Sequence, residues 1–406
     1  MNNIFIKRIE KQFGNDSTQF LEALKLPPTI SVRKNPSKPT DLWNNAEKVP
    51  WCDDGYYLLQ KPAYTLDPLF HAGCYYPQEA SSMIIDWLLR QLDIKTENPI
   101  ILDLCAAPGG KATLIVSFLN GNGLLIANEI IKNRSHILLE NLIKWGYKNC
   151  LVTQNSPEVF FSFKNIFDII VVDAPCSGEG MFRKDKRAIE EWSEINAEKC
   201  ALRQRKILDD IWHSLKSGGF LIYSTCTFNP AENEENISKF AKENHAEVMK
   251  FTPPLSWGIT SINIENGNGF AFYPHLTKGE GFFVTVIQKI DDNIAKCREM
   301  SNSKIKNIDF STLKILERSK NSKNRLIPAH SLAMSNDFIN HNHYPELELT
   351  LDDALKYLKG EPLQSSGLKK GYLLLKYKGV SLGFGKEIGN RINNLYPINW
   401  RIKIKI

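Results

Sequence analysis

The sequence predicts an α/β fold with a parallel sheet at its centre, a small α+β region before it and a small, mostly β domain after it. Three observations support this prediction. Short β runs alternate with longer helical stretches between residues 99 and 290, which is typical of a parallel sheet with right-handed crossovers. Short helical stretches mix with polar, proline-containing segments up to residue 98. Beyond residue 323, β runs are separated by glycine-containing turns.

The central region, residues 99–290, contains predicted strands and helices in alternation. The predicted strands occupy residues 100–105, 123–128, 167–173, 219–224 and 281–288. The predicted helices occupy residues 111–120, 133–146, 185–215 and 231–244. The third helix is expected to stop at Lys216-Ser217-Gly218-Gly219, because glycine is a poor helix former. Sheets of this kind bind ligands at the carboxyl ends of their strands, so functional residues are expected there.

The regions on either side complete a division into four parts. Residues 1–98 form the N-terminal region, and residues 291–322, rich in Asn, Ser and Lys, suit a linker. Residues 323–406 contain the β run 372–377 followed by turns at Lys378-Gly379 and at residues 383–385. A third, mostly β domain is therefore expected at the C-terminus.

Composition places the chain among ordinary globular proteins, with 406 residues, 42% hydrophobic and 24% charged. No signal-peptide pattern opens the chain, and no run approaches the roughly 18 consecutive apolar residues of a membrane span, so we expect a cytoplasmic location and no membrane partner. The eight cysteines include no C-x-x-C pair. We therefore expect free thiols, with neither a disulfide framework nor a metal site.

The net charge of +6 is unevenly placed along the chain. Residues 291–406 contain 20 Lys and Arg against 12 Asp and Glu, a balance of +8, which leaves −2 for the first 290 residues. Residues 366–406 hold nine basic residues and one acid, Glu387, with aromatic residues between them. Such a segment favours a nucleic-acid partner. A solvated, lysine-rich surface is the alternative that charge alone leaves open.

Two cysteines each follow a predicted strand. Cys176 comes after the run that ends at Asp173, and Cys226 comes after the run that reaches Ser224. A thiolate is a strong nucleophile, and a second thiol nearby suits a later step of the same reaction. One cysteine alone is more often a small buried side chain, but two at the ligand-binding edge favour covalent catalysis. Their positions fit either assignment of the two roles.

A small-residue loop follows the first central strand and leads into a helix. The loop reads Cys105-Ala106-Ala107-Pro108-Gly109-Gly110-Lys111, and its glycines allow close approach of a ligand at the helix N-terminus. A P-loop is excluded because Cys105 and Ala112 stand where Gly and Ser or Thr are required, and the G-x-G-x-x-G motif is absent. A plain strand-to-helix turn is the alternative.

Glu129 follows the second central strand, where doubly wound nucleoside sites carry the carboxylate that binds a ribose. Together with the glycine loop it indicates an adenosine-type site. A zinc deaminase is excluded because its P-C-x-x-C motif requires Cys where this chain has Glu179.

Several motifs together give the chain a family resemblance. They are residues 105–111, Asp173-Ala174-Pro175-Cys176-Ser177-Gly178-Glu179-Gly180 and Tyr223-Ser224-Thr225-Cys226-Thr227. In combination they resemble the Nop2/Sun (NSUN) family of RNA cytosine-5 methyltransferases. Further matches, which extend over nearly the whole chain, resemble its bacterial RsmF-like branch: residues 51–52, 73–83, 181–184, 229–234, 274–275, 279–283, 357–361 and 382–386.

The resemblance implies a Rossmann-like, seven-stranded methyltransferase domain that uses S-adenosyl-L-methionine. It implies that Cys226 is the nucleophile and that Cys176 assists product release. Asp173, close to both sites, is the candidate to hold the N3 and amino edge of the target base. The implied donor-binding residues are Cys105, Ala106, Ala107, Pro108, Gly109, Gly110, Lys111, Glu129 and Asp173. Lys111 either favours the thiolate or shapes the loop. Where many relatives carry Asp near the adenine, this chain reads Gln154-Asn155-Ser156, so Asn155 or Ser156 is expected to replace that contact.

The implied function is methylation of C5 of a cytidine in RNA, with ribosomal RNA or a ribosomal subunit as the preferred partner and a monomeric enzyme. The N-terminal region and the C-terminal domain are then expected to bind RNA. Transfer RNA is the first alternative substrate. A non-catalytic RNA-binding assembly factor is the alternative from another class, and the presence of Asp173, Cys176 and Cys226 argues against it.

Overall fold

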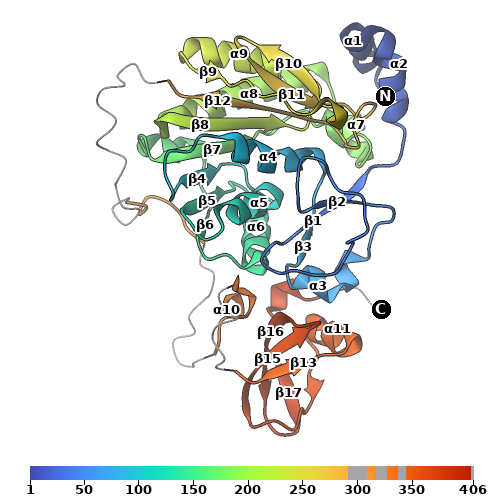
Figure 1. Ribbon diagram of the computed structural model, residues 1–406, viewed down its shortest axis with the longest axis vertical. Coiled ribbons are helices and arrows are strands. Elements are labelled where there is room, and N and C mark those ends of the chain that lie inside the picture. Colours follow the sequence, from blue (N-terminus) through green and yellow to red (C-terminus); the bar gives the residue numbers. More distant parts are fainter. Residues whose placement is uncertain (291–308, 317–326, 337–343, 404–406) are drawn as a thin grey trace.

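A computed structural model describes residues 1–290, 309–316, 327–336 and 344–403. Figure 1 shows a central sheet covered by helices, with the N-terminal helices at one end and the C-terminal domain at the other. Within those residues, no helix combines the length and the apolar character that a membrane crossing requires.

The central sheet contains nine strands within the described residues, in the order β10-β11-β12-β8-β7-β4-β5-β6, with β9 paired to β12. Five neighbouring strands are parallel: β4 (Ile100–Asp103), β5 (Leu124–Asn128), β6 (Cys150–Thr153), β7 (Phe167–Asp173) and β8 (Leu215–Thr225). Antiparallel pairing joins the other four: β9 (Glu247–Val248), β10 (Thr260–Ile264), β11 (Gly267–Phe272) and β12 (Phe282–Gln288). The predicted α/β class is confirmed, and the sheet is mixed rather than parallel throughout.

The sheet differs from the expectation in the direction of one strand and in four strands that were not predicted, β6, β9, β10 and β11. The predicted strand 281–288 is β12, which runs antiparallel to both of its neighbours, β8 and β11. The connection of residues 273–281 between β11 and β12 is too short for the crossover that two parallel strands would need. β9 and β10 are additional to the seven-stranded arrangement, which the remaining strands provide.

The helices of the central region lie between successive strands. They are α5 (Gly110–Leu119), α6 (Lys132–Trp145), α7 (Lys186–Glu191), α8 (Glu194–Trp212) and α9 (Glu234–Glu243). The predicted helix 185–215 is wrong in two places. It is interrupted at Trp192 and Ser193, because the Trp192 side chain is buried and Ser193 caps α8 by accepting a hydrogen bond from the Asn196 N–H. It also ends at Trp212, since Leu215 already belongs to β8.

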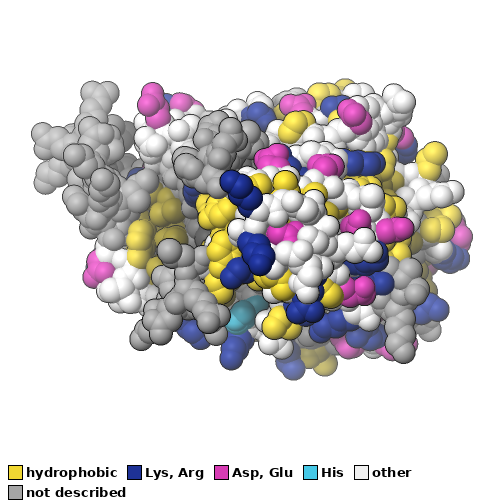
Figure 2. Space-filling model, turned by 90° about the horizontal axis from the view of Figure 1, so that it is seen from below, with side chains coloured by type: hydrophobic (Ala, Val, Ile, Leu, Met, Phe, Trp, Pro, Cys, Tyr) yellow, Lys and Arg dark blue, Asp and Glu magenta, His cyan; other side chains and the backbone are white. Residues whose placement is uncertain are grey.

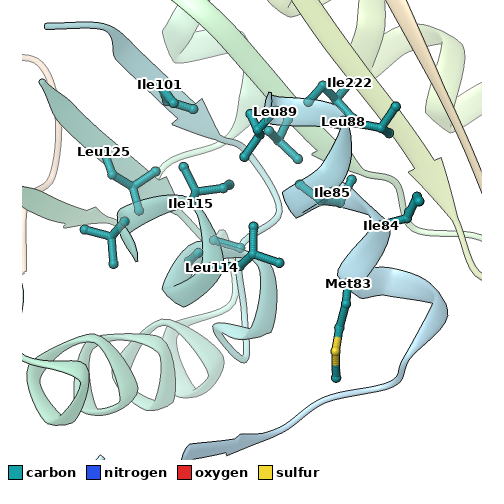
Figure 3. Close-up of a cluster of buried hydrophobic side chains, with 14 of the residues drawn as sticks. Met83, Ile84, Ile85, Leu88, Leu89, Ile101, Leu114, Ile115, Leu125 and Ile222 are labelled. Carbon is teal, nitrogen blue, oxygen red and sulfur yellow. The ribbon is translucent and has the colours of Figure 1, made fainter. Parts of the chain in front are cut away.

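One helix of the predicted N-terminal region belongs to the core of the central sheet. α4 (Ile84–Gln91) carries Ile84, Ile85, Leu88 and Leu89, which belong to one buried cluster with residues of β4, α5 and β8, as Figure 3 shows. All four side chains are at most 1% exposed. Burial of four large aliphatic side chains on one helix favours the docked arrangement by several kcal/mol, at about 1.5–3 kcal/mol each. Residues 1–98 therefore do not pack as one independent unit, and the boundary at residue 98 stays a prediction.

The rest of the N-terminal region divides into two groups. A three-stranded antiparallel sheet joins β1 (Ile30–Lys34), β2 (Gly55–Leu58) and β3 (Tyr75–Pro77), with α3 (Pro68–His71) beside it. A helical pair, α1 (Asn3–Phe13) and α2 (Ser17–Ala23), lies at the opposite end of the region, next to α7 in Figure 1. The predicted α+β character of the region is confirmed.

The C-terminal domain is mostly β, as predicted. Its sheet has the order β13-β15-β16-β17-β14. The strands are β13 (Glu346–Glu348), β14 (Leu363–Gln364), β15 (Gly371–Tyr377), β16 (Val380–Glu387) and β17 (Arg391–Asn394), and the helices are α10 (His330–Met334) and α11 (Leu351–Lys359). Many of its buried side chains cluster with Val32 of β1, Leu69 of α3 and Tyr75 of β3, and a second cluster packs Leu374 and Phe384 with Ile143 of α6.

The predicted linker falls partly outside the described residues, which leave out 291–308 and 317–326. Its described part, residues 309–316, lies along β6, where the Gln154 N–H donates to the Lys314 carbonyl and the Leu316 N–H donates to the Val152 carbonyl. Leu313 is buried in the core beneath this contact. This short segment therefore extends the edge of the central sheet.

Candidate active site

The two cysteines meet at the carboxyl edge of the sheet. β7 and β8 are parallel neighbours with Asp173 opposite Ser224, so the residues that follow both strands emerge side by side. The Cys176 and Cys226 Sγ atoms are 2.8 Å apart, and the Cys226 N–H donates to Cys176 Sγ over 3.3 Å. Both side chains are partly exposed. The structure brings together the pair that the sequence singled out.

The environment of Cys176 favours its neutral form. The hydrogen bond with Cys226 and the burial of the side chain raise the pKa of Cys176 well above its ordinary value. A thiol that keeps its proton is a poor nucleophile but can donate a hydrogen bond or a proton. A protonated Cys176 therefore suits a step in which a proton is donated.

A charged pair lies beside the cysteines. Lys111 Nζ is 2.8 Å from Asp173 Oδ2, and the Ser224 hydroxyl donates to Asp173 Oδ1 over 2.9 Å. Burial lowers the pKa of Lys111, but the negative charge of Asp173 and its hydrogen bond with Lys111 are the main causes that raise it, so the pKa of Lys111 is raised overall. Lys111 therefore stays cationic, and a thiolate at Cys226 adds to that stabilisation.

The glycine loop forms one wall of a cleft. The cleft has a volume of about 180 Å³ and is lined by loop residues, by Asp173 and, from the N-terminal region, by Tyr76, Pro77, Gln78, Glu79 and Ser82. Gly109 has φ of 121°, a conformation that side-chain-bearing residues rarely adopt. Side chains of α6 hold the loop, since Arg134 donates to the Ala107 carbonyl and Asn141 to the Pro108 carbonyl, each over 2.8 Å.

The predicted adenosine-side residues differ in their environments. Glu129 is buried at the end of β5, where it accepts the Ile131 N–H over 2.9 Å and lies 3.3 Å from Arg134. It is not among the described residues that line the cleft. Asn155 accepts the Lys314 N–H over 3.2 Å, while its amide nitrogen is buried and has no hydrogen-bond partner within the described residues.

Asp103 is a site residue that the sequence analysis did not select. It ends β4, two residues before Cys105, and neither carboxyl oxygen has a hydrogen-bond partner within the described part of the chain. Burial raises the pKa of Asp103 to about 8, with Lys111 opposing and Asp173 adding to the increase. An acid that closes a strand directly before a ligand loop is the sequence signal that would have found it.

The raised pKa of Asp103 predicts a specific pH dependence of stability. The unfolded carboxyl ionises near its ordinary pKa of 3.8, whereas the folded one keeps its proton up to about 8, so folding takes up a proton between these values. The free energy of unfolding of the wild type should therefore fall relative to that of Asp103→Asn across this window. The difference should then stay constant at higher pH.

Thermal unfolding of both proteins at a series of pH values measures this difference. A constant offset between the two stability curves from pH 4 to 9 would contradict the assignment of the buried proton to Asp103.

A buried carboxylate of the Asn229 to Glu234 motif organises the Cys176 loop. Glu232 accepts the Ser177 N–H over 2.9 Å, the Ser177 hydroxyl over 2.5 Å and the Gln204 amide over 2.9 Å. Thr225, directly before Cys226, donates to Asn233 over 2.6 Å. The motif therefore holds the loops of both cysteines from one side.

Models of known protein families match most of the chain. A family model described as 16S rRNA methyltransferase RsmB/F matches residues 90–288. Models described as the N-terminal domain of 16S rRNA methyltransferase RsmF and as the methyltransferase RsmF PUA domain match residues 1–80 and 344–402.

Two similar curated proteins are named ribosomal RNA small subunit methyltransferase F. The one from Psychromonas ingrahamii is 31% identical over 409 residues, covering 86% of this chain and 84% of the relative. The one from Aliivibrio salmonicida is 30% identical over 441 residues, covering 93% and 92%.

Solved structures share the fold. A methyltransferase homolog protein from Pyrococcus horikoshii superposes with a TM-score of 0.59 at 28% identity, over 71% of this chain and 96% of that one. The structure of NSun6 from Pyrococcus horikoshii with SFG superposes with a TM-score of 0.60 at 22% identity, over 72% and 99%.

Proposed function

Since this chain belongs to the ribosomal RNA small subunit methyltransferase F family and is an S-adenosylmethionine-dependent RNA methyltransferase, we propose that it methylates C5 of a cytidine in ribosomal RNA. The observation that carries the proposal is the pair Cys176 and Cys226, with Sγ atoms 2.8 Å apart beside Asp173 and Lys111. Two thiols at one site suit a reaction in which a covalent bond to the substrate is first made and then broken.

The residues of the cleft fit S-adenosylmethionine. Asp103 carries two carboxyl oxygens and Asn155 an amide nitrogen that are buried and lack partners among the described residues, as groups that await a ligand would. Of the loop, residues 105–108, 110 and 111 line the cleft, together with Asp173. When bound, the donor supplies an electrophilic methyl group on a sulfonium. Glu129 suits the ribose only if it exchanges part of its present bonding with Ile131 and Arg134.

The electronics of cytosine require a covalent step. C5 of cytosine is too weak a nucleophile to attack a sulfonium methyl, so a thiolate must first add to C6. In the proposed mechanism Cys226 makes this addition, which gives C5 enamine character. After C5 gains the methyl group, it loses its proton and the bond between C6 and the Cys226 sulfur breaks.

Neighbouring side chains suit these steps. Lys111 keeps a positive charge beside Cys226 and so favours the thiolate. Asp173 is held by Lys111 and Ser224, and its side chain is 35% exposed, which leaves it accessible to the N3 and amino edge of a base. Cys176, which keeps its proton, suits the release step. A paired base cannot reach these groups, so the target is expected in single-stranded or opened RNA.

Bisulfite sequencing of RNA from cells with the protein, without it, and complemented with Cys226→Ala tests the proposal. A cytidine of small-subunit ribosomal RNA should resist conversion only in cells with the wild-type protein. A site in transfer RNA instead would favour the alternative substrate, and no protein-dependent site in any RNA would favour a non-catalytic assembly factor.

The C-terminal domain offers a basic surface for RNA. Lys369, Lys370, Lys378 and Lys386 are exposed, and the ammonium groups of Lys378 and Lys386 lie 5.7 and 5.3 Å from the ring centres of Tyr377 and Tyr372. Figure 2, which views the molecule from the end that carries this domain, shows Lys and Arg side chains together with hydrophobic ones. Basic side chains interleaved with aromatic rings are typical of single-strand binding.

Point substitutions test this surface more cleanly than removal of residues 366–406, of which 404–406 lie outside the described part. That removal would delete β15, β16 and β17, whose buried side chains pack against the N-terminal sheet. We expect Lys369→Gln/Lys370→Gln/Lys378→Gln to weaken RNA binding on the order of 10-fold and to reduce the slope of log K against log salt by about 2.

A matched triple variant, Lys164→Gln/Lys199→Gln/Lys239→Gln, removes the same charge from exposed positions of the central region. Fluorescence anisotropy with a single-stranded RNA at several salt concentrations measures both. Equal salt slopes for the two triple variants would reduce the C-terminal lysines to a solubility feature.

A further inference from the structure

The helical pair α1–α2 packs on the loops that carry the cysteines. Phe5 of α1 contacts Phe182 and Trp192, with ring centres 5.1 and 5.3 Å apart, and Phe20 of α2 contacts Phe228 at 4.9 Å. Phe182 lies six residues after Cys176 and Phe228 two after Cys226. The first helices of the chain therefore cover the ends of β7 and β8 from outside.

A fully buried carboxylate lies at the centre of this contact. The Glu179 side chain has no exposed surface and accepts three hydrogen bonds: from Arg8 over 2.6 Å, from the Trp192 indole over 2.9 Å and from the Phe228 N–H over 3.1 Å. Within the described residues, Arg8 is the cation that forms an ion pair with Glu179. A buried charge is tolerated only when it is paired and hydrogen-bonded, so Arg8 permits a carboxylate at this place.

Glu179 and its neighbour join the two cysteine loops. Glu179 lies three residues after Cys176, and its bond to the Phe228 N–H reaches the chain two residues after Cys226. The Gly180 N–H donates to the Cys226 carbonyl over 2.9 Å. A Cβ at Gly180 would come within 2.5 Å of the Gly281 carbonyl oxygen and 3.0 Å of the Cys226 one, so the approach requires glycine.

α1 also holds the same backbone from its other side. Gln12 donates to the Phe228 carbonyl over 2.9 Å and accepts from Arg8 over 3.0 Å. The backbone N–H and carbonyl of Phe228 are thus both hydrogen-bonded to a network that includes Arg8.

We propose that Arg8 is a positioning residue of the methyltransferase site: by pairing with Glu179 it fixes the loop that follows Cys226 relative to Cys176. The inference rests on the proposed function, because it assumes that both cysteines act on the substrate. It assigns the N-terminal helices a part in catalysis through the geometry of the two thiols. Neither Arg8 nor Glu179 lines the cleft among the described residues, so donor binding should not depend on them.

The test measures kcat and the dissociation constant and stoichiometry of S-adenosylmethionine for the full-length protein. Arg8→Met and Glu179→Gln should each lower kcat by about 100-fold, since small displacements of reacting groups have effects of that size. The dissociation constant and stoichiometry should stay within about twofold, whereas partial unfolding would lower the stoichiometry. Arg8→Lys, which keeps the charge, should restore about 10-fold of the loss.

Lys11→Met is the matched control, because Lys11 is an exposed cation on the same helix. A kcat for Arg8→Met within about twofold of this control would overturn the proposal. The double variant Arg8→Met/Glu179→Gln should be no slower than the slower single variant, because the second substitution removes a partner already lost. Losses that multiply would overturn the coupling.

Two further outcomes keep the test decisive. If Arg8→Met fails to fold, the double variant, which leaves no unpaired charge, is measured instead at full donor stoichiometry. A kcat lowered by about 100-fold would support the proposal, and a kcat within about twofold of the Lys11→Met control would overturn it. If Cys226→Ala keeps wild-type activity, the assignment of Cys226 as the nucleophile fails, and with it the premise of this inference. If Cys226→Ala is inactive and Arg8→Met is fully active, only the present inference about Arg8 is overturned.

Discussion

Cys226→Ala is expected to abolish methyl transfer, lowering the rate on the order of 10⁴-fold or more. The reason is that cytosine C5 needs prior addition of a nucleophile to C6, and the Cys226 sulfur is the group placed beside both Lys111 and Cys176 to make it. Alanine retains the volume nearest the backbone but has no nucleophile. Incorporation of a tritiated methyl group from S-adenosylmethionine into small-subunit ribosomal RNA measures the loss.

Two controls isolate the role of the thiol. Cys226→Ala should bind S-adenosylmethionine as the wild type does, and Cys150→Ala, which removes a buried thiol from β6, should keep nearly full activity. Methyl transfer by Cys226→Ala at more than about a tenth of the wild-type rate would rule out Cys226 as the nucleophile.

The order of the central elements could be predicted because hydrophobic runs and glycine stops mark it locally. β4, α5, β5, α6 and β7 appear within a few residues of their expected places. β6, β9, β10 and β11 were not predicted; in β10 and β11, Asn and Gly, which disfavour strands, interrupt the apolar residues of Thr260–Ile264 and Gly267–Phe272. Pairing with the buried β12 decides their conformation, and no local pattern reports such pairing.

The candidate site was predictable where its residues stand at strand ends, as Cys176, Cys226 and Asp173 do. Its supporting carboxylates were not, because their partners are remote in sequence. Glu179 bonds to Arg8, 171 residues away, and Glu232 to Ser177, 55 residues away. A sequence shows which residues are acidic but not which distant donors reach them.

The same limit applies to the N-terminal helices. A sequence indicates that α1 has an apolar face, with Phe5 and Ile9 buried, but not which surface the face covers. The structure places it on the loops after β7 and β8 rather than on β1 to β3, with which it shares the N-terminal region. The contacts, rather than chain order, decide which parts of the molecule serve the site.

Cys176→Ala is expected to trap the enzyme on its product. With S-adenosylmethionine present, this variant should accumulate a covalent complex of protein and RNA that survives denaturant, and turnover should fall by about 100-fold. Cys176 keeps its proton because the bond with Cys226 and burial raise its pKa, and it lies 2.8 Å from the sulfur that must leave C6. Its loss therefore leaves addition and methylation possible and slows release. A shifted band on a denaturing gel, removed by ribonuclease, measures the adduct.

The double variant Cys176→Ala/Cys226→Ala gives the decisive comparison. It should form no adduct, because the bond to C6 requires Cys226, whereas an adduct in both variants would place that bond at another residue. Normal turnover of Cys176→Ala without any adduct would exclude Cys176 from release. An adduct formed by Cys226→Ala alone would reverse the two roles.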